Sequence, residues 1–150
     1  MVNRLGKVAF GAVLATLALG GCAGLPGGSD GVRHDEAFDV IAAAVRDASP
    51  EFADVRIDDR VDGAVSLLLV ELDMTGDEIP GAALDSAMLA LRQSVPDAFD
   101  EVRVVAVSAD DEELELEGPL RQTGVDGESM IDPVTASIPV DALRDMRILG

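Results

Sequence analysis

Few side chains in this sequence offer a nucleophile or a transition-metal ligand. The chain has one cysteine, Cys22, one histidine, His34, and no tyrosine or tryptophan. A lone histidine makes a poor transition-metal site, because such sites need several nitrogen or sulfur ligands. We therefore expect His34 to be exposed and inert. No serine lies in a Gly-x-Ser-x-Gly nucleophile elbow. We predict a protein that is not an enzyme, with no catalytic residue, no metal site and no cofactor.

Carboxylates are the abundant ionisable groups of this chain, which has 29 Asp and Glu residues and 11 Lys and Arg residues. The stretch 58–63 resembles the opening of a calcium-binding EF-hand loop, but Arg60 takes the third ligand position and Leu69 the twelfth, so the motif fails. The run 110–113 offers carboxylates for loose binding of a hard cation, although we favour a solvated acidic turn. Glycosidase-like carboxylate pairs need a shaped cleft, and without Tyr or Trp this enzyme class is the weakest alternative.

The N-terminal segment has the order of an export signal. Arg4 and Lys7 form a positively charged region, and no acidic residue precedes Asp30. The apolar run 8–19 follows, and it is shorter than the roughly 20 residues that a transmembrane helix needs. Such a length is typical of the apolar region of a signal peptide.

The apolar run leads directly into Leu19, Gly20, Gly21 and Cys22. These four residues resemble the lipobox of bacterial lipoproteins, which has Leu at −3, small residues at −2 and −1, and an obligatory Cys. The composition is also similar to that of lipoproteins of high-GC Gram-positive bacteria. The resemblance implies that Cys22 receives a diacylglycerol and that signal peptidase II cleaves before it, after recognising Leu19, Gly20 and Gly21.

This resemblance places the protein at the cell membrane, lipid-anchored on the extracytoplasmic face. Residues 1–21 would be the lipoprotein signal peptide, and the Gly-rich residues 22–34 a flexible tether. An uncleaved anchor over 8–29 is disfavoured because its second half is rich in Gly, a poor helix former. A secreted, non-lipidated protein would need an Ala-x-Ala-like cleavage site, and none is well placed.

The net charge of the mature protein limits the classes of partner that it can bind. Without residues 1–21 the chain keeps 29 acids and loses Arg4 and Lys7, so its formal net charge is about −20. Such a surface repels nucleic acid, whose binding depends on Lys and Arg neutralising phosphates, and anionic lipid headgroups. We predict no nucleic-acid partner. The charge serves either solubility or binding of a cation or a cationic partner.

The region 35–118 has the periodicities of an α+β domain. Apolar residues at helical spacing predict a helix from Asp35 that ends before Pro50, and a second helix from Pro80 to Pro96. Its buried stripe comprises Leu84, Ala87, Met88, Leu91 and Val95.

Four strands are predicted beside these helices. A hairpin joins residues 55–57 to the apolar strand 64–72 through a turn at Asp62-Gly63, and that apolar strand should be central and covered on much of both faces. Residues 102–107 form a third strand. Leu114 and Leu116, alternating with glutamates, predict a fourth, half-exposed strand.

An internal repeat supports the same plan. The first helix and the corner 50–57 match the second helix and the corner 96–104 in residue type. Two helix-corner-hairpin units give an αββαββ two-layer sandwich, with a four-stranded, mostly antiparallel sheet and both helices on one face. Residues 119–150 are expected to be an irregular tail, with a short helix over 141–147, that caps the other sheet face or forms a partner-binding arm. Without such a cap the other sheet face would be solvated.

These features favour a non-enzymatic protein-interaction module of the cell envelope, anchored by lipid and paired with another envelope protein. The alternative is a carrier lipoprotein for a small ligand or cation, in which the sheet and residues 119–150 would enclose an apolar cleft. A carboxylate-dependent enzyme is the second alternative. An exposed apolar patch would support the first of these, and a cleft involving the tail would support the carrier.

Overall fold

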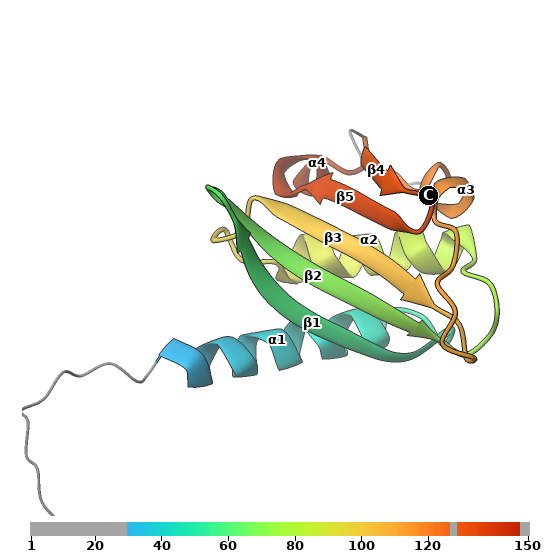
Figure 1. Cartoon of the computed structure of the whole chain (residues 1–150), viewed down its shortest axis with the longest axis horizontal. Coiled ribbons are helices and arrows are strands. Elements are labelled where there is room, and N and C mark those ends of the chain that lie inside the picture. The colour runs from blue at the N-terminus through green and yellow to red at the C-terminus, as the bar shows by residue number, and fades with distance from the viewer. Residues whose placement is uncertain (1–29, 127–128, 148–150) are drawn as a thin grey trace, which may run out of the picture.

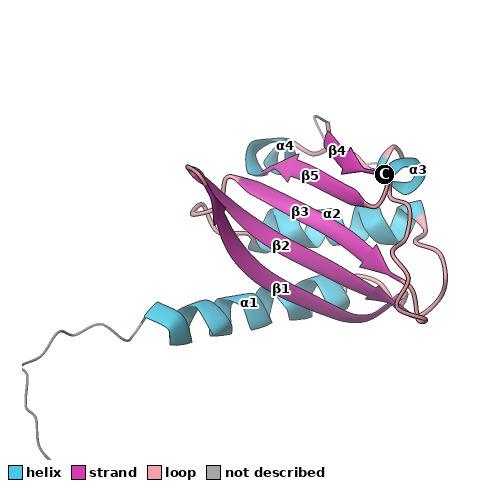
Figure 2. Cartoon of the chain, in the orientation of Figure 1, coloured by secondary structure: helices cyan, strands magenta, loops and turns pink. Residues whose placement is uncertain are grey.

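A five-stranded sheet forms the centre of the structure, and helices pack on it (Figures 1 and 2). The computed structural model describes residues 30–126 and 129–147, with side chains described for 35–126 and 130–147. The elements are α1 (Asp30–Arg46), β1 (Phe52–Asp62), β2 (Val65–Met74), α2 (Gly81–Ser94), β3 (Glu101–Val107), α3 (Glu117–Leu120), β4 (Ser129–Asp132), β5 (Thr135–Pro139) and α4 (Val140–Arg144). The strand order is β1-β2-β3-β5-β4. The predicted α+β class is confirmed.

Helix α1 and the β1–β2 hairpin form where the sequence predicts them. Ile41 and Val45 of α1 are buried in the core. The helix begins at Asp30, inside the segment assigned to the tether. In the hairpin, Asp62 pairs with Val65 as the last residue of β1, so only Gly63 and Ala64 form the loop. Gly63 has a φ of 64°, as the first loop residue of a type II′ turn requires.

Strand β2 is central, as predicted, but the helices cover only one of its faces. Leu68, Val70 and the following alternate residues to Met74 belong to the main core. Because side chains alternate along a strand, Leu69 and Glu71 point to the opposite face, where they are only partly buried. On the same face Leu67 is 0% exposed, so this face is covered at the start of the strand and partly covered farther along, in agreement with the predicted cover on much of both faces.

The pairing of β2 with β3 is parallel, which corrects the antiparallel arrangement expected for consecutive units. Leu68 pairs with Val102 and Leu72 with Ala106. The chain leaves the end of β2 and returns through α2 to the opposite end of the sheet, and such a helical crossover makes the two strands parallel. The predicted buried stripe of α2 is found, with Leu84, Ala87, Met88 and Leu91 buried and Val95 partly buried.

The predicted fourth strand at Leu114 and Leu116 is wrong. Only an isolated bridge between Val107 and Glu113 forms there. The edge of β3 is instead taken by β5, whose Ala136 and Ile138 pair with Val104 and Val102. Leu116 is fully buried and donates its N–H to the carbonyl of Pro133 at 3.0 Å. The alternation of leucines and glutamates therefore does not indicate a strand here. It includes one buried apolar side chain, Leu116, that anchors the segment.

The segment 119–150, expected to be an irregular tail, contributes two strands, a helix and part of the core. The β4–β5 hairpin extends the sheet, and Val140, Leu143 and Met146 join the main core. All four helices place buried residues in this same core. The described residues of the segment therefore place no helix on the other face of the sheet, and the predicted four-stranded sandwich is corrected to a five-stranded mixed sheet with one face that no described helix covers.

The internal repeat is found in the structure as a helix, a corner and one strand in each unit. The second unit lacks the predicted hairpin. Phe52 begins β1 and Phe99 precedes β3, and both are buried at equivalent corners. Phe99 packs against Phe38 of α1, with ring centroids 6.3 Å apart. The first strand pairs with β2 antiparallel and the second parallel, so the two units lie on opposite sides of β2.

Candidate functional site

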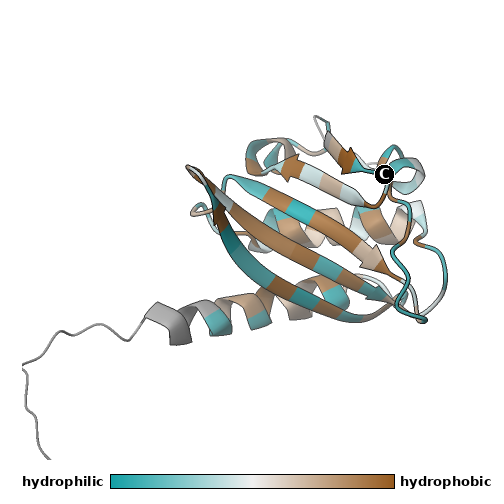
Figure 3. Cartoon of the chain, viewed as in Figure 1, coloured by the Kyte–Doolittle hydropathy of each residue, from teal (hydrophilic) through white to brown (hydrophobic). Residues whose placement is uncertain are grey.

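The sheet face opposite the helices, here called the open face, gathers side chains from four strands. Strand register places matching positions of β1, β2, β3 and β5 in rows across it. Apolar residues concentrate along β2 and β3, while β1 at the edge is largely polar (Figure 3). The open face comprises Asp54, Arg56, Asp58, Arg60, Leu67, Leu69, Glu71, Asp73, Glu101, Arg103, Val105, Val107, Thr135 and Ser137.

A depression of about 550 Å³ lies on the open face. Its apolar floor contains Leu69 of β2 and Val105 of β3, both partly buried. Thr135 of β5 borders it on one side and Asp58 of β1 on the other. No Cys, His or Ser lines the depression, so its lining suits the binding of an apolar group better than covalent chemistry.

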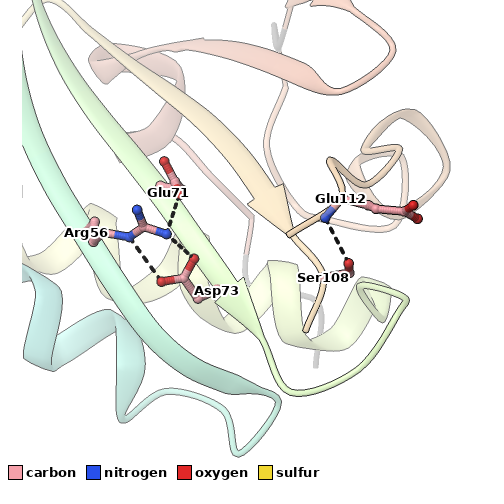
Figure 4. Close-up of polar contacts among 5 residues, drawn as sticks. All are labelled: Arg56, Glu71, Asp73, Ser108 and Glu112. Carbon is pink, nitrogen blue, oxygen red and sulfur yellow. Dashed lines mark hydrogen bonds and ion pairs between the residues drawn. The ribbon is translucent and has the colours of Figure 1, made fainter. Parts of the chain in front are cut away.

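Arg56 holds two carboxylates of the neighbouring strand at the rim of this depression. Its Nη2 lies 2.6 Å from Asp73 Oδ1 and 2.5 Å from Glu71 Oε1, and its Nε donates to Asp73 Oδ2 at 3.1 Å (Figure 4). The hydrogen bond to Asp73, followed by the charges of Asp73 and Glu71, raises the pKa of Arg56. The guanidinium therefore stays charged and fixes both carboxylates on the open face.

A second ion pair lies on β3. Arg103 Nε donates to Glu101 Oε1 at 2.9 Å, and both side chains are mostly buried. Leu69 pairs with Arg103 across the strands, and Glu71 pairs with Val105. The apolar floor thus lies between two ion-paired systems.

Most arginines of the described region are already neutralised internally. Ion pairs with carboxylates involve Arg46, Arg56, Arg103, Arg121, Arg144 and Arg147. Because the chain has far more acids than bases, the carboxylates left over dominate the surface potential. Long-range attraction therefore favours a cationic partner.

The acidic turn at 110–113 is built around a buried serine. Ser108 Oγ accepts the N–H of Asp110 at 3.3 Å. It also accepts the N–H of Glu112 at 3.1 Å (Figure 4). Asp111 has a φ of 62°, a left-handed conformation that Asp tolerates in turns. The four acidic side chains are exposed, as expected for a solvated turn.

A second, acidic depression of about 450 Å³ adjoins this turn, lined by Asp77, Glu78, Ile79, Glu113, Leu114, Glu115 and Pro119. In the described region, no three Asp, Glu, His or Cys side chains are grouped closely enough to hold a metal ion. The stretch 58–63, which resembles the start of an EF-hand loop, lies on β1 and its turn. The predicted absence of a metal site remains a prediction for the whole chain.

The predicted lipidation site lies outside the described residues. This applies to Cys22, to the recognition residues Leu19, Gly20 and Gly21, and to the whole signal peptide 1–21. The side chain of His34 is likewise outside the described part, although its backbone belongs to α1. These predictions therefore stand on the sequence alone.

The sequence allowed a solvated sheet face opposite the helices, but it did not predict the ion pairs of Arg56 with Glu71 and Asp73 on that face. The signal was present, since Glu71 and Asp73 interrupt an apolar run at alternate positions and so indicate one polar face of β2. The opposition of Arg56 to Glu71 depends on the hairpin register, which the Gly63 turn sets. The role of Thr135 could not be found, because the strand that carries it was assigned to the tail.

Comparison of the chain with protein-family models, with curated proteins and with solved structures gives no match. Within residues 30–126 and 129–147, no helix combines the length and the apolar character that crossing a bilayer requires.

Proposed function

We propose that this protein is a lipid-anchored, extracytoplasmic lipoprotein whose domain binds another protein of the cell envelope through the open face of its sheet. The lipobox-like Leu19 to Cys22 supports the anchor. Seven residues separate Cys22 from the start of α1 at Asp30. At ~3.6 Å per residue they span at most roughly 25 Å, so the domain would stay close to the bilayer.

The open face is the observation that carries the binding proposal. A sheet normally buries its apolar face against another layer, yet here partly exposed Leu69 and Val105 lie between ion pairs with no helix above them. Interfaces of standard size bury about 800 Å² per partner, and the open face draws its residues from four strands. The fixed ion pairs would determine how a partner aligns on this face.

A second candidate function is the carriage of a small apolar ligand. The depression of about 550 Å³ falls in the range of roughly 300–1,000 Å³ that is typical of ligand pockets. Thr135, from the segment 119–150, borders it. Its open form on a sheet surface favours a protein partner, because ligand pockets usually enclose most of the ligand.

The anchor is tested by Cys22→Ser. We expect this variant to lose incorporation of labelled fatty acid and to leave the membrane fraction, because the thioether is the only attachment of the lipid. Unchanged membrane association of the full-length variant would contradict the lipoprotein proposal.

Binding is tested by cross-linking in living cells. The tagged wild-type protein is cross-linked, purified and analysed by mass spectrometry, with a tagged, unrelated lipoprotein as control. A discrete envelope protein recovered only with the wild-type protein is expected. A result identical to the control would contradict the proposal that the domain binds an envelope protein. It would favour the carriage of a small ligand instead.

A further inference from the structure

Strand β1 leaves a free edge on the sheet, and its outer half is accessible. It is the outermost strand and pairs only with β2. Helix α1 packs against its first half, where Val55 is buried, whereas Val61 in the second half is 68% exposed. The Asp59 N–H donates to Asp58 Oδ1 at 2.8 Å, so it faces away from β2. Because alternate residues of a strand turn their backbone groups to opposite edges, residues 57, 59 and 61 offer N–H and C=O groups to another strand.

Opposite charges alternate along this strand on the open face. Arg56 and Arg60 alternate there with Asp58 and Asp62. Among the arginines whose side chains the structure describes, Arg60 is the one with neither an ion pair nor a hydrogen bond. Asp58 and Asp62 likewise form no ion pair with the described side chains. A strand with the same alternation, shifted by one step, would pair all these charges.

A second copy of β1 is such a strand. When two antiparallel copies are related by a two-fold axis at Asp59, Arg60 lies opposite Asp58 of the second copy. Arg56 then lies opposite Asp62 of the second copy, and the symmetry forms each of these pairs twice. Opposite charges directly across two strands stabilise their pairing.

The same register also covers exposed apolar surface. On the side of β1 that faces the helices, it places Ile57 opposite Val61 of the second copy. Ile57 is partly buried and Val61 is 68% exposed in the single chain. Pairs of β-branched side chains stabilise adjacent strands, so the two copies would shield each other's Val61.

Neighbouring registers fit less well. An axis at Asp58 places arginine opposite arginine and aspartate opposite aspartate, which is destabilising. An axis at Ile57 restores opposite charges, but it sets the buried Val55 against Asp59 and requires the half of β1 against which α1 packs. The register centred on Asp59 has one pair of like charges, formed by Asp59 with itself on the axis.

The net acidity of the chain opposes this pairing only at long range. Salt at physiological strength screens exposed charges that are farther apart than about 8 Å. The charges in direct contact therefore decide which strand fits the edge.

We propose that two copies of the domain join through the free edges of their β1 strands, about a two-fold axis at Asp59, so that their sheets become one continuous sheet. Residues directly opposite in such a pair point to the same side, so the helices of both copies lie on one side and the two open faces adjoin. Figure 1 shows the outer end of the β1–β2 hairpin projecting past the start of β3, where the second copy would lie. This inference goes beyond the proposed function, because it concerns a second copy and not an envelope protein.

Cross-linking at the two-fold axis tests the proposed register. Asp59→Cys is made in the full chain together with Cys22→Ser, so that position 59 carries the only thiol, and the protein is kept in detergent micelles. The Cα atoms of a hydrogen-bonded antiparallel pair lie about 5.5 Å apart, within reach of a short bismaleimide. Asp110→Cys, which removes the same charge from the exposed acidic turn, is the matched control. We expect about tenfold more covalent dimer from position 59 than from position 110, and equal yields would overturn the inference.

A charge swap tests the pairing of Arg60 with Asp58. Arg60→Asp, added to Asp59→Cys, places like charges opposite one another and should lower the yield of covalent dimer at least fivefold. Further addition of Asp58→Arg exchanges the two charges and should restore the yield to within twofold. Asp110→Arg in place of Asp58→Arg gives the same net charge and should restore nothing. Equal recovery with both additions, or none with Asp58→Arg, would overturn the register.

Hydrogen exchange tests the wild-type chain, in which Asp59 keeps its charge. Mass spectrometry should show that the amides of residues 57–61 exchange more slowly as the protein concentration rises, whereas those of β4 do not change. Exchange in β1 that is independent of concentration would overturn the pairing. Cross-links in cells from position 59 to a different protein, with none to a second copy, would assign the edge to another partner and also overturn it.

Discussion

Gly124 is the position where one methyl group should do the most damage. A Cβ built there lies 1.7 Å from the carbonyl oxygen of Arg147, whereas ordinary contacts begin at 3.4 Å. The Arg147 N–H donates to the Gly124 carbonyl at 2.9 Å, and the Gly124 N–H donates to Asp85 Oδ1 at 3.1 Å. Gly124→Ala therefore forces the segment after α3 apart from the segment after α4 and strains the hydrogen bond to Asp85 of α2.

The loss of unfolding free energy can be estimated from the contacts that Gly124→Ala disrupts. Overpacking of a tight site costs about 1–3 kcal/mol, and each of the two hydrogen bonds contributes about 1 kcal/mol. If the end of the chain detaches instead, Met146, which is 4% exposed, loses the burial of its side chain, worth about 1.5–3 kcal/mol. Either route destabilises the fold by roughly 3–5 kcal/mol.

Thermal unfolding followed by circular dichroism measures this effect. A domain of this size loses roughly 4 °C per kcal/mol, so we expect Tm to fall by about 12–20 °C. Gly76→Ala is the control, because, its chain neighbours apart, nothing lies within 4 Å of a Cβ built there and its φ is not in the left-handed region. Equal Tm values for the two variants would refute the packing of the C-terminal segment.

Two further predictions test the faces of the sheet by urea denaturation. Leu72→Ala should lower the unfolding free energy by about 2–5 kcal/mol, because Leu72 is fully buried in the core. Leu69→Ala, on the open face of the same strand, should cost about 1 kcal/mol or less, and a reversed order would contradict the assignment of the faces. Arg56→Gln should cost less than about 1 kcal/mol, because its side chain is 59% exposed and exposed ion pairs contribute little. A loss of several kcal/mol would show that the Arg56 cluster is structural.

Local sequence patterns predicted the first part of the fold well. The apolar spacing around Ile41 and Leu84 and the prolines at 50 and 96 located both long helices, since these signals act within one element. Gly63 located the hairpin because a positive φ favours glycine. The exact last residue of β1 escaped prediction, since Asp62 tolerates both a strand and a turn.

The second part of the fold depends on contacts between distant segments. Leu114 and Leu116 have the alternation of a strand, but β5 occupies the edge of β3 that they would need. The segment that forms β5 reads Thr-Ala-Ser-Ile-Pro and has little strand propensity of its own. Its place is decided by the small Ala136 and by Ile138, which fill the core beside β3.

One long-range feature was nevertheless available in the sequence. A strand, a helix and a second strand in succession favour a parallel crossover, and β2, α2 and β3 follow this order. The repeat suggested two hairpins instead and so obscured the crossover. The candidate site was hard to predict for the same reason. The ion pairs of Arg56 with Glu71 and Asp73 depend on the register of β1 against β2 as well as on the types of these three residues.

Site-specific photo-cross-linking in living cells shows whether an envelope protein binds the open face. A photoreactive amino acid is placed at Leu69, in the floor of the depression, or at Gln93, an exposed position on α2. If the open face is the binding surface, position 69 gives a discrete adduct of one partner and position 93 gives none. Adducts of equal yield from both positions, or from position 93 alone, would contradict it.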